Sequence, residues 1–216
     1  MKTTLAWLLA LPALLAATLA ALSVGRFPIS ATEFWLLITS RGDAVNPAAA
    51  AVFWNIRGPR VLAAMLVGAA LAGAGAAFQA MFRNPLASPD LLGVSAGASL
   101  GAVAGIFLGL PVAGVQGAAF AGGIAAVAGV AALARAVRAE GGDPLLILVL
   151  AGIAFGALVG AAISLLKVFA DPYNQLPAIT FWLLGTLSGV NRADVIAAAP
   201  LAILGLVLLV LLRWRL

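Results

Sequence analysis

Cysteine and histidine are both absent from this chain of 216 residues, and only 9% of its residues are charged. Without thiols or imidazoles the chain can form no disulfide, no thiolate or imidazole metal site and no histidine-based acid–base centre. Its two lysines, Lys2 and Lys167, lie outside any G-x-x-x-x-G-K-[ST] sequence, so it cannot bind ATP through a phosphate loop of its own. We therefore predict that the chain is not an enzyme and holds neither a cofactor nor a metal ion.

Charge of either sign is too sparse for the surface of a soluble protein. Apolar residues account for 64% of the chain and the mean hydropathy is +1.17, whereas a typical soluble domain is about 25% charged. Lipid must therefore be the solvent for much of the surface. The formal net charge of +5 is scattered among the predicted loops, with no lysine or arginine run that would indicate a nucleic-acid partner. These features predict an integral membrane protein in contact with the lipid bilayer.

Six segments are apolar enough to cross a membrane, because about 20 helical residues at 1.5 Å each span a hydrocarbon core of ~30 Å. They are Leu5 to Val24, Val61 to Phe82, Leu91 to Leu110, Val112 to Val137, Asp143 to Phe169 and Val195 to Leu212. A surface helix at 32–40 and a half-helix at 176–187 are too short to cross. The predicted fold class is an all-α membrane protein, a polytopic helical bundle of about six transmembrane helices plus short interfacial and half-helices, with residues 1–216 forming one transmembrane domain.

Local patterns mark where several of these helices begin. Ser30-Ala31-Thr32-Glu33 has the form of a capping box before the surface helix. Pro59 suits the first turn of the second span, and Ser88-Pro89-Asp90 supplies a cap, a first-turn proline and an acid for the third. The first span has a second interpretation as a cleaved signal peptide, but its apolar run is longer than the usual ~7–15 residues. We therefore expect it to be retained.

The distribution of positive charge leaves the orientation undecided. With the N-terminus inside, the inner set is Lys2, Arg83, Arg135, Arg138, Arg213 and Arg215, and the outer set is Arg26, Arg41, Arg57, Arg60, Lys167 and Arg192. Six residues on each side give a tie under the positive-inside rule. The close pair Arg135 and Arg138 slightly favours a cytoplasmic N-terminus.

Glycine recurs every fourth residue in two of the predicted spans. The third span carries Gly93, Gly97, Gly101, Gly105 and Gly109, and the fifth carries Gly152, Gly156 and Gly160, continued by Ser164. A period of four keeps these residues near one helix face, where small residues let two membrane helices approach closely. We predict helix packing for both stripes. The alternative is a face that lines a pathway or slides against a neighbour.

A run of motifs in the first half of the chain carries a family resemblance. Residues 57–101 read RGPRVLAAMLVGAALAGAGAAFQAMFRNPLASPDLLGVSAGASLG, and residues 181–190 read FWLLGTLSGV. The first stretch contains R-x-P-R, then R-N-P-L-A-x-P from Arg83 to Pro89, then L-L-G-x-x-x-G-A from Leu91 to Ala98. The chain closely resembles the permease family of ABC importers for iron–siderophores, haem and cobalamin over nearly its whole length.

The resemblance implies an architecture and a set of partners. Permeases of this family have ten spans, pair with a second permease copy as a dimer and enclose a pathway between the copies. A periplasmic substrate-binding protein delivers cargo, and separate cytoplasmic ATPase subunits hydrolyse ATP. The implied location is the bacterial inner membrane with a cytoplasmic N-terminus. By this comparison the chain is expected to lack the C-terminal spans and the coupling helices.

The resemblance also nominates functional residues. Asn84-Pro85 must leave the helix, because proline disfavours the α conformation at the residue before it. By resemblance this turn and the start of the fifth span form the cytoplasmic gate, with Asn84, Leu86, Leu145 and Leu146 as candidates. Arg57 and Arg60 match the arginine spacing that receives acidic residues of the binding protein, and arginine pairs bidentately with carboxylate. Anchoring of Arg57 and Arg60 to lipid phosphates is the alternative.

We therefore expect a permease that moves iron chelates or cobalamin, and three alternatives remain. One is an importer of oxyanions such as molybdate within the same family. Another is a truncated or split permease without independent transport. A secondary transporter driven by an ion gradient fits less well, because such proteins usually carry ionisable residues at mid-membrane and none of the six predicted spans does.

Overall fold

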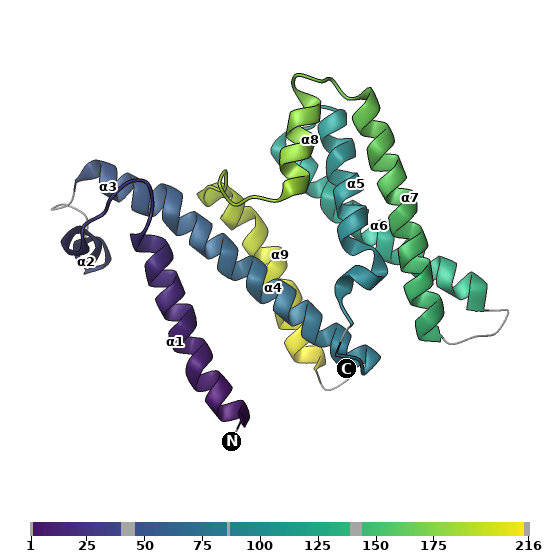
Figure 1. Cartoon of the computed structure of the whole chain (residues 1–216), viewed down its shortest axis with the longest axis horizontal. Coiled ribbons are helices and arrows are strands. Elements are labelled where there is room, and N and C mark those ends of the chain that lie inside the picture. The colour runs from purple at the N-terminus through teal and green to yellow at the C-terminus, as the bar shows by residue number, and fades with distance from the viewer. Residues whose placement is uncertain (1, 40–45, 86, 139–143, 214–216) are drawn as a thin grey trace. The chain divides into compact units, whose positions relative to one another are not determined.

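The structure is a computed structural model that describes residues 2–39, 46–85, 87–138 and 144–213, and every regular element in those ranges is helical (Figure 1). Internal contacts divide the chain into two compact units. Unit 1 comprises Met1–Leu71 with Leu187–Val210, and unit 2 comprises Ala72–Thr186 with Leu211–Leu216. The long helix α4 (Gly58–Phe82) runs from the first unit into the second.

Unit 1 contains the N-terminal helices and the last one. Its elements are α1 (Lys2–Ser23), α2 (Ala31–Thr39), α3 (Pro47–Val52), the π-helical turn η1 (Phe53–Arg57), the first part of α4, and α9 (Arg192–Leu212). A small core joins the short helices, where Leu37, Ala49 and Phe53 are buried. The rings of Phe34 and Phe53 meet edge to face with their centroids 5.8 Å apart. This core fixes α2 against the start of the α3–η1–α4 run.

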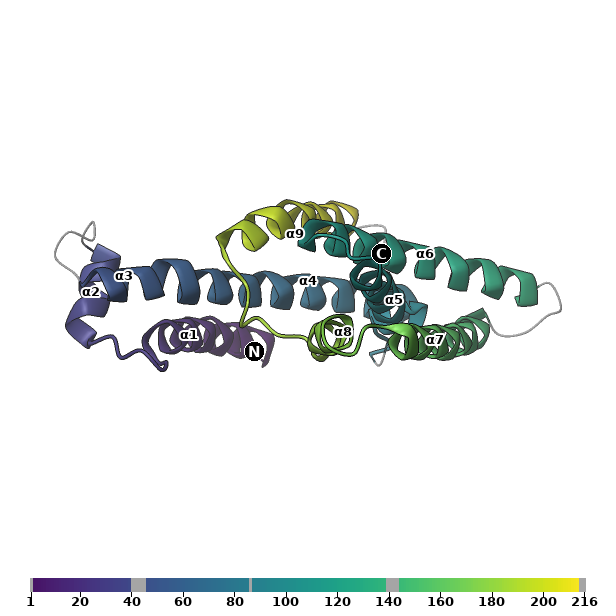
Figure 2. The same cartoon turned by 90° about the horizontal axis from the view of Figure 1, so that it is seen from above.

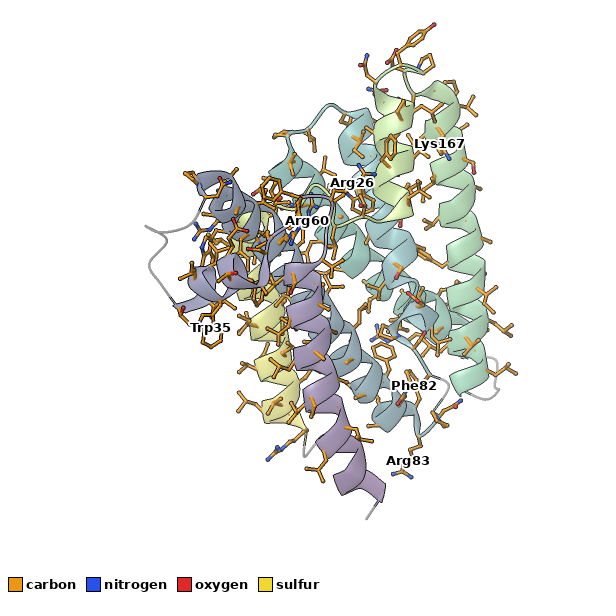
Figure 3. All side chains as sticks on the ribbon, turned by 60° about the vertical axis from the view of Figure 1, so that its left-hand side comes forward. Arg26, Trp35, Arg60, Phe82, Arg83 and Lys167 are labelled. Carbon is orange, nitrogen blue, oxygen red and sulfur yellow. The ribbon has the colours of Figure 1, made fainter. Side chains whose placement is uncertain are left out.

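The capping box that the sequence predicted is present at the start of α2. The Ser30 backbone N–H donates to the Glu33 carboxylate at 2.9 Å, and the Glu33 backbone N–H donates to the Ser30 hydroxyl at 3.2 Å. These hydrogen bonds lower the pKa of Glu33, so the box is lost only as the pH falls through that lowered value. Trp35, 66% exposed, points away from the helix (Figure 3), as expected for a helix lying at a membrane interface.

The second predicted span begins earlier than its proline suggested. Helix runs without interruption from Pro47 to Phe82, and Pro59 lies inside this run. The turn before the proline is π-helical, with the Gly58 N–H donating to the carbonyl of Phe53. A proline ring clashes with the carbonyl four residues earlier, and the wider turn relieves that clash. Pro59 thus lies in the first turn of α4, as predicted, but α4 continues a helical run that begins at Pro47.

Unit 2 is a cluster of helices built around α5. Its elements are the end of α4, the 3-10 turn η2 (Pro89–Leu92), α5 (Val94–Phe107), α6 (Val112–Arg138), α7 (Pro144–Phe169) and α8 (Gln175–Leu184). Helix α5 packs along α6 and also contacts α7 and α8 (Figure 2). Val103 and Ile179 are fully buried where α5 meets α8. The Gln175 side chain donates to the Phe107 carbonyl at 2.9 Å, which ties the start of α8 to the end of α5.

The described helices confirm most of the predicted spans. Four are long and apolar enough to cross a membrane: Pro47–Phe82, Val112–Val137, Leu146–Phe169 and Arg192–Leu212. The first predicted span is the helix α1, and the predicted half-helix is α8 with 10 residues. The third predicted span corresponds to α5, which is shorter than expected and has only 14 residues. Glycines with positive φ, Gly93 and Gly109, lie at its two ends and interrupt the helix.

Candidate functional site

Arg57 occupies a buried position at the end of α1. The side chain is 7% exposed, and its guanidinium donates to the backbone carbonyls of Leu22 and Ser23 at 2.7 Å each and to that of Phe27. The last carbonyls of a helix have no partner within the helix, and a cation there also complements the helix dipole. Arg57 therefore closes the C-terminus of α1 and holds the following turn.

The turn after α1 is shaped around this guanidinium. A Cβ atom added at Gly25 would fall within 3.0 Å of Arg57 Nη2, so a larger residue there would have to displace the guanidinium from its carbonyl partners. The donors of Arg57 point at its own chain, and this geometry gives no support to the predicted docking role of Arg57. The contact could not be predicted from local sequence patterns, because the carbonyls lie 30 or more residues before the arginine.

Arg60 has a different environment from Arg57. It is half-buried, its Nη2 donates to the carbonyl of Ser188, and its Nε atom has no hydrogen-bond partner among the described residues. Figure 3 shows its place in unit 1. With one nitrogen committed and the group partly exposed, Arg60 keeps donors for a carboxylate of another molecule.

A pocket of about 240 Å³ opens in unit 1 between the start of α4 and the start of α9. Its lining residues are Trp54, Gly58, Pro59, Leu62, Arg192, Val195 and Ile196. Arg192 is the one charged residue among them. The pocket could not be predicted from the sequence, because 130 or more residues separate its two sides.

The predicted tight turn after α4 is present. The Asn84 N–H donates to the Gln79 carbonyl at 3.2 Å and the Arg83 N–H to the Ala80 carbonyl at 3.2 Å, which closes the helix as a Schellman motif. Arg83 adopts φ 48°, the left-handed position of that motif (Figure 3). The chain then enters η2 rather than α5 directly, and Ser88 makes no side-chain cap.

Of the four gate candidates, the structure describes the side chains of two, Asn84 and Leu146. Asn84 is half-buried in the turn, and Leu146 in the first turn of α7 is 56% exposed. Leu86 and the side chain of Leu145 lie outside the described residues. The 3-10 turn η2, which follows the Asn84 turn in the chain, contacts α7, the fifth predicted span. The gate role itself stays a prediction.

The glycine stripe of α5 lies against α6. A Cβ atom at Gly97 or Gly101 would fall within 3.0 Å of the α6 backbone, at Gly122 and Ala118 respectively. Gly105 is also buried, with the Val115 Cα 3.2 Å from such an atom. The outer two members differ. Gly93 and Gly109 flank α5 and have positive φ angles, a backbone conformation that glycine adopts more easily than other residues.

The stripe of α7 is mostly unpartnered. Gly152 packs against the Leu91 carbonyl of η2, where an added Cβ would fall within 3.0 Å. A Cβ at Gly156 or Gly160 would meet nothing within 4 Å among the described residues. Ser164, which continues the stripe, is exposed and donates to the Gly160 carbonyl at 2.9 Å. Helix α7 is thus packed at Gly152, and its face at Gly156 and Gly160 has no neighbour among the described residues.

No group of three or more acidic side chains comes together in the described part of the chain.

Sequence comparison places these features in a family. The profile of the FecCD transport family matches residues 13–216. The cobalamin import system permease protein BtuC of Halobacterium salinarum is 42% identical over 162 residues, covering 74% of this chain and 42% of that protein. The molybdate import system permease protein MolB of Haemophilus influenzae is 31% identical over 197 residues, covering 90% of this chain and 58% of that protein. The chain spans about half the length of these relatives.

A solved structure has the same arrangement of helices. It is described as a metal-chelate type ABC transporter in an inward-facing conformation, and it superposes with a TM-score of 0.78 at 30% sequence identity. The match covers 94% of this chain and 60% of that one. Together with the family profile, it makes the chain a polytopic helical membrane protein of a known transport fold, and the chain belongs to the FecCD transport family.

Proposed function

We propose that this chain forms part of the permease of an ABC importer that moves iron chelates or cobalamin across the bacterial inner membrane. The observation that carries the proposal is the structural match to a metal-chelate type ABC transporter over 94% of the chain. The similarity to a cobalamin import permease points to the same class of cargo, a metal held inside an organic ligand. The alignments cover only 42% and 58% of the two relatives, so we assign the activity to the whole permease assembly and not to this chain alone.

The proposed mechanism involves no bond chemistry in this chain. ATPase subunits on the cytoplasmic side hydrolyse ATP, a periplasmic binding protein delivers the cargo, and two permease copies enclose the pathway. The N-terminus is cytoplasmic in this arrangement. The turn at Asn84 and Leu86, together with Leu145 and Leu146, forms the cytoplasmic gate. The contact between η2 and α7 supports this assignment, because η2 begins five residues after Asn84 and a shift of α7 would act on the segment that follows the turn.

The open face of α7 is the proposed surface for the rest of the assembly. Gly156 and Gly160 have free space beside them, and Ala157 and Ala161 on the same helix are exposed. Small residues permit a second helix to approach or leave room for cargo. We propose that this face lines the pathway or meets a partner helix there.

We propose Arg60 as the docking residue for the binding protein. Arg60→Glu places like charges against the acidic residues of the partner, and we expect at least about a tenfold loss of affinity, in the range measured for buried charge pairs. The measurement is binding-protein affinity for the purified permease in nanodiscs at two salt concentrations. If affinity and its salt dependence are unchanged, Arg60 does not contact the binding protein.

Arg57 provides the matched comparison. Arg57→Glu leaves the carbonyls at the end of α1 without donors, and an unsatisfied buried polar group costs about 1–3 kcal/mol. We therefore expect a lower yield of folded protein. If Arg57→Glu folds normally and loses only binding-protein affinity, Arg57 is a docking residue after all.

A second candidate cargo is an oxyanion. The molybdate import permease of Haemophilus influenzae covers 90% of this chain, more than the cobalamin permease does. The deciding experiment is uptake into proteoliposomes that hold the complete permease with its ATPase and binding protein. ATP-dependent uptake of a labelled ferric siderophore or cobalamin is the expected result. Uptake of molybdate alone would favour the second candidate, and uptake of none of these would contradict both.

A further inference from the structure

The pocket of unit 1 combines an apolar wall with one arginine. Leu62, Val195, Ile196 and Trp54 supply the apolar lining, and Arg192 supplies the charge. At about 240 Å³ the pocket is below the ~300–1,000 Å³ typical of sites for drug-sized ligands. A whole metal chelate is therefore too large for it, and the pocket is separate from the cargo proposed above.

Arg192 has no acidic partner among the described residues. Asp194, the acid nearest in sequence, accepts from the Asn191 N–H at 3.0 Å, and Asn191 Oδ1 accepts from the N–H groups of Ala193 and Asp194. These bonds form a capping box that commits Asp194 to the start of α9. The exposed guanidinium of Arg192 is therefore left to pair with an anion from outside the chain.

The position of Arg192 fits a membrane interface. Helix α9 has 21 residues, a length of about 31 Å at 1.5 Å per residue, which matches a hydrocarbon core of ~30 Å. Arg192 is its first residue, so it lies at headgroup level when α9 spans the bilayer. None of the apolar window of α9 is buried inside the structure, and Ile196 and Leu201 are 69% and 57% exposed. The apolar lining of the pocket thus continues into a lipid-facing surface.

We infer that this pocket binds an anionic phospholipid, with the Arg192 guanidinium against the headgroup phosphate and an acyl chain along Leu62, Val195 and Ile196. A molecule with an anionic end and an apolar tail matches both parts of the lining. Trp54, 53% exposed at the mouth, is of the residue type that favours the headgroup level. A carboxylate of a soluble partner would match the arginine but would leave the apolar wall without a ligand.

The experiment is native mass spectrometry of the 216-residue chain released from micelles that contain defined lipids. The probes are dioleoyl-phosphatidylglycerol, dioleoyl-phosphatidylcholine with the same chains, and glycerol 3-phosphate without chains. We expect one retained phosphatidylglycerol, little phosphatidylcholine and no glycerol 3-phosphate. Arg192→Gln should reduce retention about fivefold, the effect of about one basic residue near an anionic surface, and Arg192→Lys should restore most of it.

Two matched controls separate the pocket from general effects. Arg135→Gln removes another exposed arginine, outside the pocket, and should leave retention unchanged. Ile196→Trp fills the pocket and should lower retention, whereas Leu201→Trp, on the same helix outside the lining, should not. Circular dichroism and gel filtration report folding, and if Arg192→Gln does not fold, the lysine and tryptophan variants decide the question.

Three results would overturn the inference. The first is equal retention of phosphatidylglycerol and phosphatidylcholine, and the second is equal loss in Arg192→Gln and Arg135→Gln. The third is a chain that binds no lipid in this pocket and dimerises through it, so that Ile196→Trp weakens the dimer. None of these readouts depends on transport, so the inference stands or falls separately from the proposed function.

Discussion

Helices α5 and α7 carry the same glycine period and use it differently. In α5 the central glycines meet the backbone of α6 so closely that no Cβ atom fits at Gly97 or Gly101. In α7 Gly152 meets η2, while no described residue lies within 4 Å of a Cβ atom added at Gly156 or Gly160. A four-residue period therefore predicts a face of small residues, but not whether that face is already covered within the chain.

The difference follows from what lies beside each helix in unit 2. Helix α6 follows α5 after a short turn and packs along it as an antiparallel partner. Helix α7 contacts α5, α6 and η2 with its other residues, such as Val159, which is 4% exposed. Its glycine face is left for something beyond the described residues, and substitutions along the two stripes should separate stability from transport.

The largest expected effect belongs to Gly97→Leu. The added side chain must push α5 away from Gly122 and Ala126 of α6, and overpacking of this kind costs typically about 1–3 kcal/mol. The measurement is the loss of helicity and of a monodisperse gel-filtration peak as a denaturing detergent is titrated into the purified protein. Gly117→Leu is the matched control, because that α6 glycine has nothing within 4 Å of an added Cβ. Equal behaviour of the two variants would contradict the packed stripe.

A smaller effect is expected for Gly152→Ala. Its new Cβ would meet the Leu91 carbonyl, but η2 has only four residues and can move more readily than a whole helix. We expect a loss of about 1 kcal/mol, the lower end of the overpacking range. The same detergent titration measures it, with Gly156→Ala as control. A loss as large as that of Gly97→Leu would mean that η2 is held as rigidly as α6.

Several features of the fold could be predicted from the sequence because their partners are close along the chain. The Ser30–Glu33 capping box and the turn at Asn84 involve residues at most five apart, and both are present. The burial of Arg57 could not be predicted, since its three carbonyl partners come from the end of α1 and the turn after it, 30 or more residues before the arginine. The start of the second span was misplaced because a π-helical turn accommodates Pro59 within a continuing helix.

The candidate site was predicted only in part for the same reason. The family motifs identified the residues, but spacing alone did not separate Arg57, which binds its own chain, from Arg60, which keeps free donors. The glycine period likewise did not reveal that Gly93 and Gly109 serve helix ends through positive φ angles. For the arginines the missing information is the identity of a spatial neighbour, and for Gly93 and Gly109 it is the backbone conformation at the helix end.

The smallest effect on stability is expected for Gly160→Leu. No residue that the structure describes lies within 4 Å of an added Cβ atom there, and surface substitutions usually change stability by less than about 0.5 kcal/mol. The detergent titration of the isolated chain should give the same midpoint as the unchanged protein. A destabilisation close to that of Gly97→Leu would show that the face is covered within this chain.

Uptake by the assembled importer tests the account most directly. The permease is reconstituted with its ATPase and binding protein, and ATP-dependent uptake of a ferric siderophore or cobalamin is measured per unit of folded permease. The account predicts that Gly160→Leu abolishes uptake although the protein is fully folded, because the leucine fills the pathway or the partner-helix contact. It predicts that folded Gly97→Leu retains the uptake of the unchanged protein. Normal uptake by Gly160→Leu, or lost uptake by fully folded Gly97→Leu, would contradict it.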